Sequence, residues 1–250
     1  MKNRKALSIM LMVVLLCFSS MAYAEWNFGI GTGPQIIGVD GDVVFGTAKL
    51  DMNSSSSDIG DIGQNMLGLT GYATDGKWII KYQIGQLTLG ESGSIGTVGG
   101  LPFYADSEFD ILSAEVTGGI YVYDRSFLKV NTYFGFRFVK HKMDLVLSGN
   151  ITGQGEIEDS WGDGLFGLGF EFPFNDKFSL DVQADVAFGK SEGGIRGYTG
   201  IKYNFYGDLS ATFFGRYNKV DYHSGNPASP NYYEYDANET SAGVIVMYNF

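Results

Sequence analysis

Nine charged residues occupy alternate positions within otherwise apolar segments, and they are the side chains in this sequence best placed to do chemistry together. Successive side chains of a strand point to opposite faces, so each charge shares a face with its polar neighbours and opposes an apolar face. The signs are mixed and nearly balanced. The residues are Lys81, Glu115, Lys129, Arg137, Glu171, Asp181, Asp185, Lys202 and Arg216.

These charges allow two interpretations if they share one interior. They could pair with one another and fill that interior, or they could line a narrow, water-filled path that passes small solutes. Mixed signs predict weak ion selectivity for such a path. Both alternatives stay open from the sequence alone.

Catalytic and metal-binding chemistry has little support. The chain has two histidines, His141 and His223, and they do not stand at the spacing of zinc ligands. Asp221 and His223 resemble the Asp-x-His pair of the omptin outer-membrane proteases, in which the pair helps to activate water. Those enzymes also need an acidic pair, and no matching motif is found. The sequence therefore predicts no catalytic residue, no metal and no cofactor, with an omptin-like surface hydrolase as a remote alternative.

The first residues have the form of a secretory signal peptide. A basic start at residues 2–5 precedes an uncharged run of 13 residues, 6–18, which is shorter than the about 20 that a membrane helix needs. Ala22-Tyr23-Ala24 then supplies the small-x-small pattern that signal peptidase reads. We predict a signal at 1–24, cleaved between Ala24 and Glu25, and one domain at 25–250. The only cysteine, Cys17, leaves with the signal.

Composition narrows the class of protein. The formal net charge is −11, and loss of the basic start makes it more negative, which argues against a nucleic-acid partner. Glycine accounts for 36 of 250 residues, about twice its usual share, and 15% of residues are aromatic. Glycine and aromatic residues in two-residue alternation are typical of a membrane barrel built from strands.

Hydrophobic alternation predicts the strands. Every even position of 178–188 is apolar, whereas the odd positions include Asp181, Gln183 and Asp185. Two-residue alternation continues over 128–138 with the same parity, and over 199–205 and 209–217 with the apolar face on the odd positions. Short turns then alternate along the chain with longer connections, as the periplasmic turns and outer loops of outer-membrane barrels do. The expected outer connections are about 36–63, 90–107, 141–160, 189–194 and 223–238.

This alternation of connections sets the expected fold. We predict an all-β, antiparallel, up-and-down transmembrane barrel, most simply of ten strands. The expected strands are 26–35, 64–73, 77–89, 109–122, 127–140, 161–173, 178–188, 195–206, 208–222 and 239–250. An extra hairpin within 36–63 would give twelve strands, and the loss of a pair would give eight.

The last strand resembles the C-terminal signal of bacterial outer-membrane barrel proteins. Phe250 ends the chain, and Tyr248, Val246 and Val244 stand at alternate positions before it. In that class the pattern is read by the outer-membrane assembly machinery, so the resemblance implies this machinery as a partner. It also implies a Gram-negative outer-membrane location.

Residues 46–53, 57–62 and 66–78 are similar to the first loop and first hairpin of the porin-like family of small outer-membrane barrels. The resemblance implies surroundings of lipid and lipopolysaccharide, and it implies location better than activity. We therefore expect a porin-like barrel passing small solutes through a narrow charged lumen. The alternative is a closed structural or adhesive barrel acting through acidic outer loops, whose carboxylates could bind divalent cations.

Overall fold

A computed structural model describes residues 26–45, 48–53, 67–98, 101–149, 153–227, 229 and 231–250. The expected signal peptide and its cleavage residues Ala22, Ala24 and Glu25 lie outside these residues. So do residues 46–47, 57–62 and 66 of the segments that are similar to porin-like proteins. Across the described part of the chain, no helix is long and apolar enough to cross a membrane.

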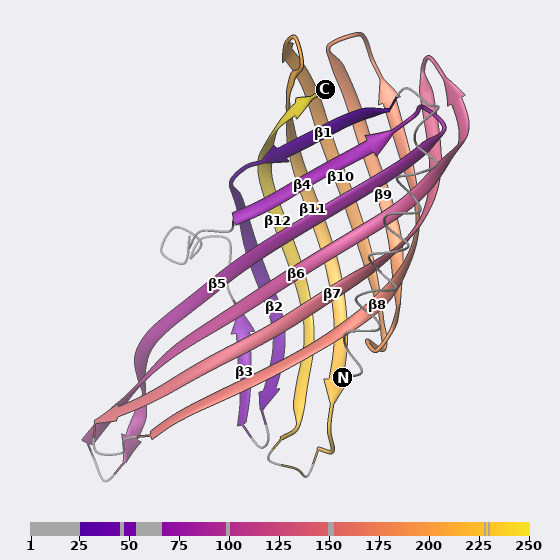
Figure 1. Cartoon of the computed structure of the whole chain (residues 1–250). Helices are drawn as coiled ribbons and strands as arrows, with labels where there is room; N and C mark the ends of the chain where they lie inside the picture. Colours follow the sequence, from indigo (N-terminus) through magenta and orange to yellow (C-terminus); the bar gives the residue numbers. More distant parts are fainter. Residues whose placement is uncertain are drawn as a thin grey trace, which may run out of the picture.

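The described residues form one antiparallel sheet that closes on itself, as Figure 1 shows. From β4 to β12 each strand pairs with the next one along the chain, and pairing of β1 with both β4 and β12 completes the circle. The strands are β1 (Asn27–Thr32), β2 (Gln35–Phe45), β3 (Ala48–Asn53), β4 (Leu67–Thr74), β5 (Trp78–Val98), β6 (Leu101–Arg125), β7 (Leu128–Gly149), β8 (Gly153–Pro173), β9 (Phe178–Gly189), β10 (Gly193–Tyr206), β11 (Leu209–Ser224) and β12 (Tyr233–Asn249).

The first strand of the barrel wall is built from β1 and β2 together. Both strands pair with β12: β1 pairs with residues 246–249 of β12, and β2 pairs with residues 233–243. Gly33 and Pro34 separate β1 from β2. Proline has no N–H to give to a ladder, which explains the interruption. The Pro34 carbonyl nevertheless accepts a hydrogen bond of 3.1 Å from Val244 N, so the wall continues across the break.

The prediction of ten wall strands is confirmed for the described residues, with β1 and β2 counted as one. The hairpin that would have given twelve does form, since Asp42 of β2 pairs with Asp51 of β3. However, β3 pairs only with β2, while β4 pairs with β1, so β3 lies outside the closed circuit. The expected outer connection 36–63 is therefore wrong over β2 and β3.

The strands β5, β6, β7 and β8 are much longer than the sequence predicted. They have 21, 25, 22 and 21 residues, whereas about 9–11 suffice to cross a membrane. Residues 90–107 and 141–160 were expected to be outer connections, and most of them are strand. Apolar alternation marks only the part of a strand that faces lipid, so it could not reveal an extension into water.

The outer surface of the wall is apolar across its middle. On β7, the outward Phe134, Phe136 and Phe138 are 63%, 51% and 36% exposed. The inward Asn131 and Tyr133 of the same strand are buried. The next outward side chains, Lys140 and Lys142, are charged and pair with Glu158 and Asp144. The apolar belt on β7 therefore ends at Phe138.

Many glycines sit beneath an aromatic ring of a neighbouring strand, which links the two enriched residue types. A Cβ placed on Gly167 would lie 2.4 Å from Tyr133 Cζ and 2.7 Å from the Ala184 carbonyl oxygen. Similar close approaches join Gly29 to Tyr72, Gly162 to Phe136 and Gly164 to Phe188. At Gly167 a ring and a backbone carbonyl occupy the space of the missing side chain, whereas at the other three sites a ring alone occupies it.

Replacing Gly167 with alanine is expected to lower the free energy of unfolding by about 1–3 kcal/mol, the usual cost of overpacking. The backbone carbonyl of Ala184 cannot move aside as a side chain can. Gly118→Ala is the matched control, because nothing lies within 4 Å of its added Cβ. Urea unfolding of both variants in lipid vesicles measures the difference, and equal stabilities would contradict this explanation.

Candidate functional site

The interior of the barrel gathers all nine charges that the sequence analysis singled out. Eight of them line one or both of two cavities in the lumen, and the ninth, Asp185, pairs with Arg137 in a cluster beside them. They come from β5, β6, β7, β8, β9, β10 and β11. The two-residue period places each one inward, because its neighbours in the chain face lipid.

A buried ion network crosses the lumen at the level of Glu115. Arg196 donates from Nη1 to Glu115 Oε2 at 2.7 Å and from Nη2 to Oε1 at 2.9 Å. Arg137 Nε donates to the same Oε2 at 3.1 Å. Two parallel bonds between a guanidinium and a carboxylate make the strong fork geometry, and they tie β6 to β10 across the interior.

Asp185 completes this network from β9. Its Oδ2 accepts from Arg196 Nε at 2.8 Å and from the Tyr133 hydroxyl at 2.9 Å, and Arg137 Nη2 lies 3.8 Å from Oδ1. The side chains of Arg137 and Arg196 are each 11% exposed and that of Asp185 is 1% exposed. Hereafter the ion network means Glu115, Arg137, Asp185 and Arg196.

A layer of aromatic and aliphatic side chains lies further out along the same strands. Trp161 stacks on Tyr222 with ring centroids 4.1 Å apart, and His141 meets Tyr235 edge to face at 4.6 Å. The outer layer, as we call it, comes from six wall strands and comprises Val39, Val43, Phe109, Val139, His141, Met143, Trp161, Val220, Tyr222, Tyr233, Tyr235 and Ala237.

His141 is fully enclosed by this layer, with its Nδ1 2.6 Å from the Tyr233 hydroxyl. It lies beyond the apolar belt, between the outward Lys140 and Lys142. Burial lowers the pKa of His141 to about 3, since the apolar surroundings disfavour the charged ring. The imidazole is therefore neutral at neutral pH and serves as a packing element of the outer layer.

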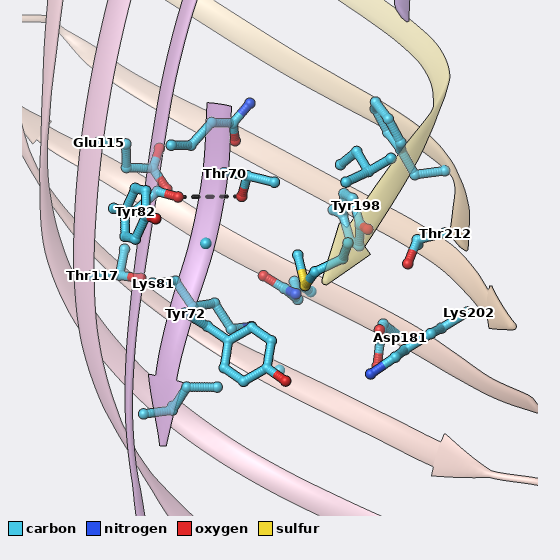
Figure 2. Close-up of a pocket in the computed structure, with 18 of the residues that line it drawn as sticks. Thr70, Tyr72, Lys81, Tyr82, Glu115, Thr117, Asp181, Tyr198, Lys202 and Thr212 are labelled. Carbon is cyan, nitrogen blue, oxygen red and sulfur yellow. Dashed lines mark hydrogen bonds between the residues drawn. The ribbon is translucent and has the colours of Figure 1, made fainter. Parts of the chain in front are cut away.

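The ion network separates two cavities in the described part of the lumen. The larger, of about 390 Å³, extends from the network to Thr74 and Lys129 at the turn end of the strands. The smaller, of about 80 Å³, lies between the network and the outer layer and is lined by Val139 and Trp161. Figure 2 shows Lys81, Asp181, Lys202 and Tyr198 around the larger one, named here the inner cavity.

Of the two interpretations of the lumen charges, pairing across the interior describes one part of the lumen and an open path describes another. Glu115, Arg137 and Asp185 do pair across the interior. The other six form no ion pair within 4.0 Å with any described residue: Lys81, Lys129, Glu171, Asp181, Lys202 and Arg216. The lumen is therefore packed and paired at one level, and hollow with separated charges at the other.

Arg196 is the functional residue that sequence reasoning missed. It makes three hydrogen bonds in the ion network, as many as Glu115, yet the alternation was followed on this strand only from Thr199 onwards. Arg196 shares the even parity of Lys202, so extending the pattern by three residues would have placed it inward. Gly194 and Gly197 lie close to Arg196, and because glycine has no side chain they give no apolar or polar signal for either face.

The Asp-x-His pair lies away from the lumen. Asp221 and His223 are on the outward face of β11, and His223 Nδ1 lies 3.4 Å from Glu192 Oε1 at an exposed position. Asp221 faces Asp236 across the strand pair. Within the residues that the structure describes, no group of three or more His, Cys, Asp or Glu side chains could hold a metal ion.

The C-terminal residues close the barrel. Phe250 and Phe28 exchange backbone hydrogen bonds of 2.8 Å in both directions, and their rings stack at 5.7 Å. Val246, Tyr248 and Phe250 are 45%, 48% and 63% exposed on the outer face, which Val244 shares. This aromatic edge faces outward at the turn end of the wall.

No family model matches this chain, and no curated protein does. Several solved structures are similar to it. The translocator domain of the autotransporter NalP from Neisseria meningitidis has a TM-score of 0.53 at 13% identity, over 100% of this chain and 98% of that one. The outer-membrane protease OmpT from Escherichia coli gives 0.42 at 10% identity, over 90% and 96%. The attachment invasion locus protein Ail of Yersinia pestis gives 0.36 at 13%, over 90% and 99%.

The likeness to the NalP translocator domain defines a class by its fold. The chain is an antiparallel β-barrel of the outer-membrane type, with an apolar outer belt and a polar lumen. At such low identity the likeness shows the fold alone. Function must therefore be argued from the lumen and the outer sheet of this chain.

Proposed function

We propose that the protein is an integral component of a Gram-negative outer membrane, with a closed lumen, that acts without catalysis through the part of its sheet outside the cell. Lipid and lipopolysaccharide surround its belt, and the C-terminal strand is the element that the assembly machinery reads. The observation that carries this proposal is the double closure of the lumen by the ion network and the outer layer.

The two closures have different physical characters. The ion network holds four charges in place with direct bonds, and breaking it would leave charges without partners at a nearly dry level. The outer layer excludes water because its rings pack at interior density, with Tyr235 and Val39 at 0% and 1% exposure. Ten strands also enclose little more than the eight that side chains just fill.

The extended ends of β5, β6, β7 and β8 are the surface offered to the outside. They continue past the belt for about as many residues as a membrane crossing takes. Beyond Phe138 the outward lysines of β7 face the outward glutamates of β8, with Lys140 paired with Glu158 and Lys142 near Glu156. A twisted, charged sheet of this kind suits contact with a macromolecule better than passage of a solute.

The wild-type barrel is expected to give no conductance steps above background in planar bilayers, because both closures block ion passage. Trp161→Ala with Tyr235→Ala should remove much of the outer layer, and Arg196→Met in addition should produce steps. Phe138→Ala is the matched control, since it lies outside the lumen at a similar level. Steps from the wild-type protein would overturn the proposal.

A narrow, gated passage for small solutes is the second candidate. The inner cavity favours it, because separated charges and about 390 Å³ of space fit a route that stops at the ion network. Conductance that appears with Arg196→Met alone would support a gate made of ions, and would promote this candidate over the closed barrel. Peptidase activity lost on Asp221→Asn or His223→Ala would instead support a surface hydrolase.

A further inference from the structure

We propose that the inner cavity is a binding site for a small aromatic molecule carrying an oxyanion, with Arg216 as the anchor of the anion. This inference goes beyond the proposed function, because it concerns the periplasmic half of the lumen and needs no partner at the outer sheet. It would also hold for a barrel that conducts.

Arg216 has donor groups that the protein leaves unused. Its Nε donates to Ser241 Oγ at 3.2 Å, and the two terminal nitrogens make no hydrogen bond to any described residue. The side chain lines both cavities, at the closed end of the larger one. A guanidinium presents its terminal N–H groups as a planar fork that matches carboxylate and phosphate oxygens.

The carboxylates nearest to Arg216 are already engaged. Glu115 gives both of its oxygens to Arg196 and one also to Arg137. Glu239 accepts from Asn218 at one oxygen and from the Tyr235 hydroxyl at the other. A positive charge at the closed end of a cavity, with no free carboxylate of its own, favours an anion from outside the chain.

The positive charge continues along the cavity. Lys81, Lys129 and Lys202 line its wall without an ion pair among the described residues, whereas Glu171 and Asp181 stand directly opposite each other on β8 and β9. The cavity therefore has four cations against two carboxylates outside the ion network. Figure 2 shows Lys202 and Asp181 reaching into the same space, away from Glu115. Entry of an anion is thus favoured over entry of a cation.

The wall next to Arg216 supplies an apolar surface. Tyr198 is the direct cross-strand neighbour of Arg216, and its ring stacks on Phe214 with centroids 5.8 Å apart at 20°. Both rings line the cavity. Aromatic surfaces favour a flat apolar partner. A volume of about 390 Å³ lies at the small end of the range for ligand pockets, which suits a single ring with one charged group.

Calorimetric titration of the mature barrel in detergent micelles at low salt tests the proposal. Benzoate and phenyl phosphate are the probes, and their relative affinities distinguish a carboxylate ligand from a phosphate ligand. Benzyl alcohol and inorganic phosphate are the two partial probes, one without the anion and one without the ring. We expect at least one full probe to bind more tightly than both partial ones, and binding to weaken in high salt.

Arg216→Gln is expected to weaken that binding by at least about tenfold, the effect of losing a charge-assisted hydrogen-bonding partner. Arg125→Gln is the matched control, an identical substitution at an exposed residue at the end of β6, beside the turn to β7. Arg216→Lys keeps the charge without the fork and should bind at an intermediate level. Heat-modified gel mobility reports whether each variant forms a barrel.

Three results would contradict the proposed binding site. No binding to the wild-type barrel would overturn the proposal, as would equal binding by folded Arg216→Gln, or benzyl alcohol or inorganic phosphate binding as tightly as both full probes. None of these results changes the conductance of the barrel, so a failure here is separate from a failure of the closed-lumen proposal.

Discussion

Replacing Arg196 with methionine is expected to lower the free energy of unfolding by about 3–5 kcal/mol, the cost of removing one partner from a buried ion cluster. Arg196 alone supplies three hydrogen bonds, two to Glu115 and one to Asp185. Methionine retains much of the volume but none of the charge. Arg137 then remains as the single cation facing two carboxylates, and Asp185 is 1% exposed, so water replaces little of what is lost.

Reversible urea unfolding in lipid vesicles measures this effect. Lys140→Met is the matched control, because its ion pair with Glu158 at 2.8 Å joins side chains that are 35% and 49% exposed. Exposed ion pairs contribute about 1 kcal/mol at most, so the control should remain close to the wild type. Similar losses in both variants would mean that the lumen at this level is well hydrated.

A double variant isolates the interaction itself. Glu115→Gln with Arg196→Met should cost less than the sum of the two single changes, since each single change removes the charged partner with which the other residue forms two hydrogen bonds. Additive losses would indicate that Glu115 and Arg196 act independently, and the fork geometry between them would then carry no special stability.

The alternation of side chains was enough to predict the barrel and the face on which each strand carries its charges. Phe178 to Phe188 shows why, since one parity is wholly apolar and the other holds Asp181 and Asp185. Lipid requires that pattern of every wall strand, so it is visible locally. The strand count followed from the short turns, which are local as well.

The partners across the lumen could not be predicted in the same way. Glu115 and Arg196 are 81 residues apart and come from β6 and β10, strands that do not pair with each other. Their contact depends on the stagger of the strands around the closed wall, and no short window of sequence records that stagger. The outer layer escaped prediction for the same reason.

Extensions beyond the membrane were missed for a different physical reason. Beyond Phe138 the outward face of β7 meets water and the inward face meets the outer layer. The outward residues Lys140, Lys142 and Asp144 are therefore charged, and the apolar alternation stops although the strand continues. Glycine-rich polar stretches such as 153–155 then look like loops. Backbone pairing with β6 and β8 holds these segments as strand.

Replacing Phe134 with arginine is expected to destabilise the barrel by about 2–4 kcal/mol, the cost of placing a cation on the lipid face at mid-depth. Phe134 lies near the middle of the belt on β7, 63% exposed, and packs against Phe166 at 4.8 Å. In water, a substitution at so exposed a residue would change stability by only about 0.5 kcal/mol in either direction.

Val122→Arg is the control that tests whether the cost of Phe134→Arg comes from lipid contact. Val122 is 61% exposed, almost equal to Phe134, but lies three residues from the end of β6, beside the turn to β7. Arginine there is near the interface and should cost about 0–1 kcal/mol in a bilayer. Because the two sites differ in depth and hardly in exposure, a gap of about 2 kcal/mol or more between them in vesicle-based unfolding measures lipid contact. Equal costs would place both residues in water, and the apolar belt would then need another partner to cover it.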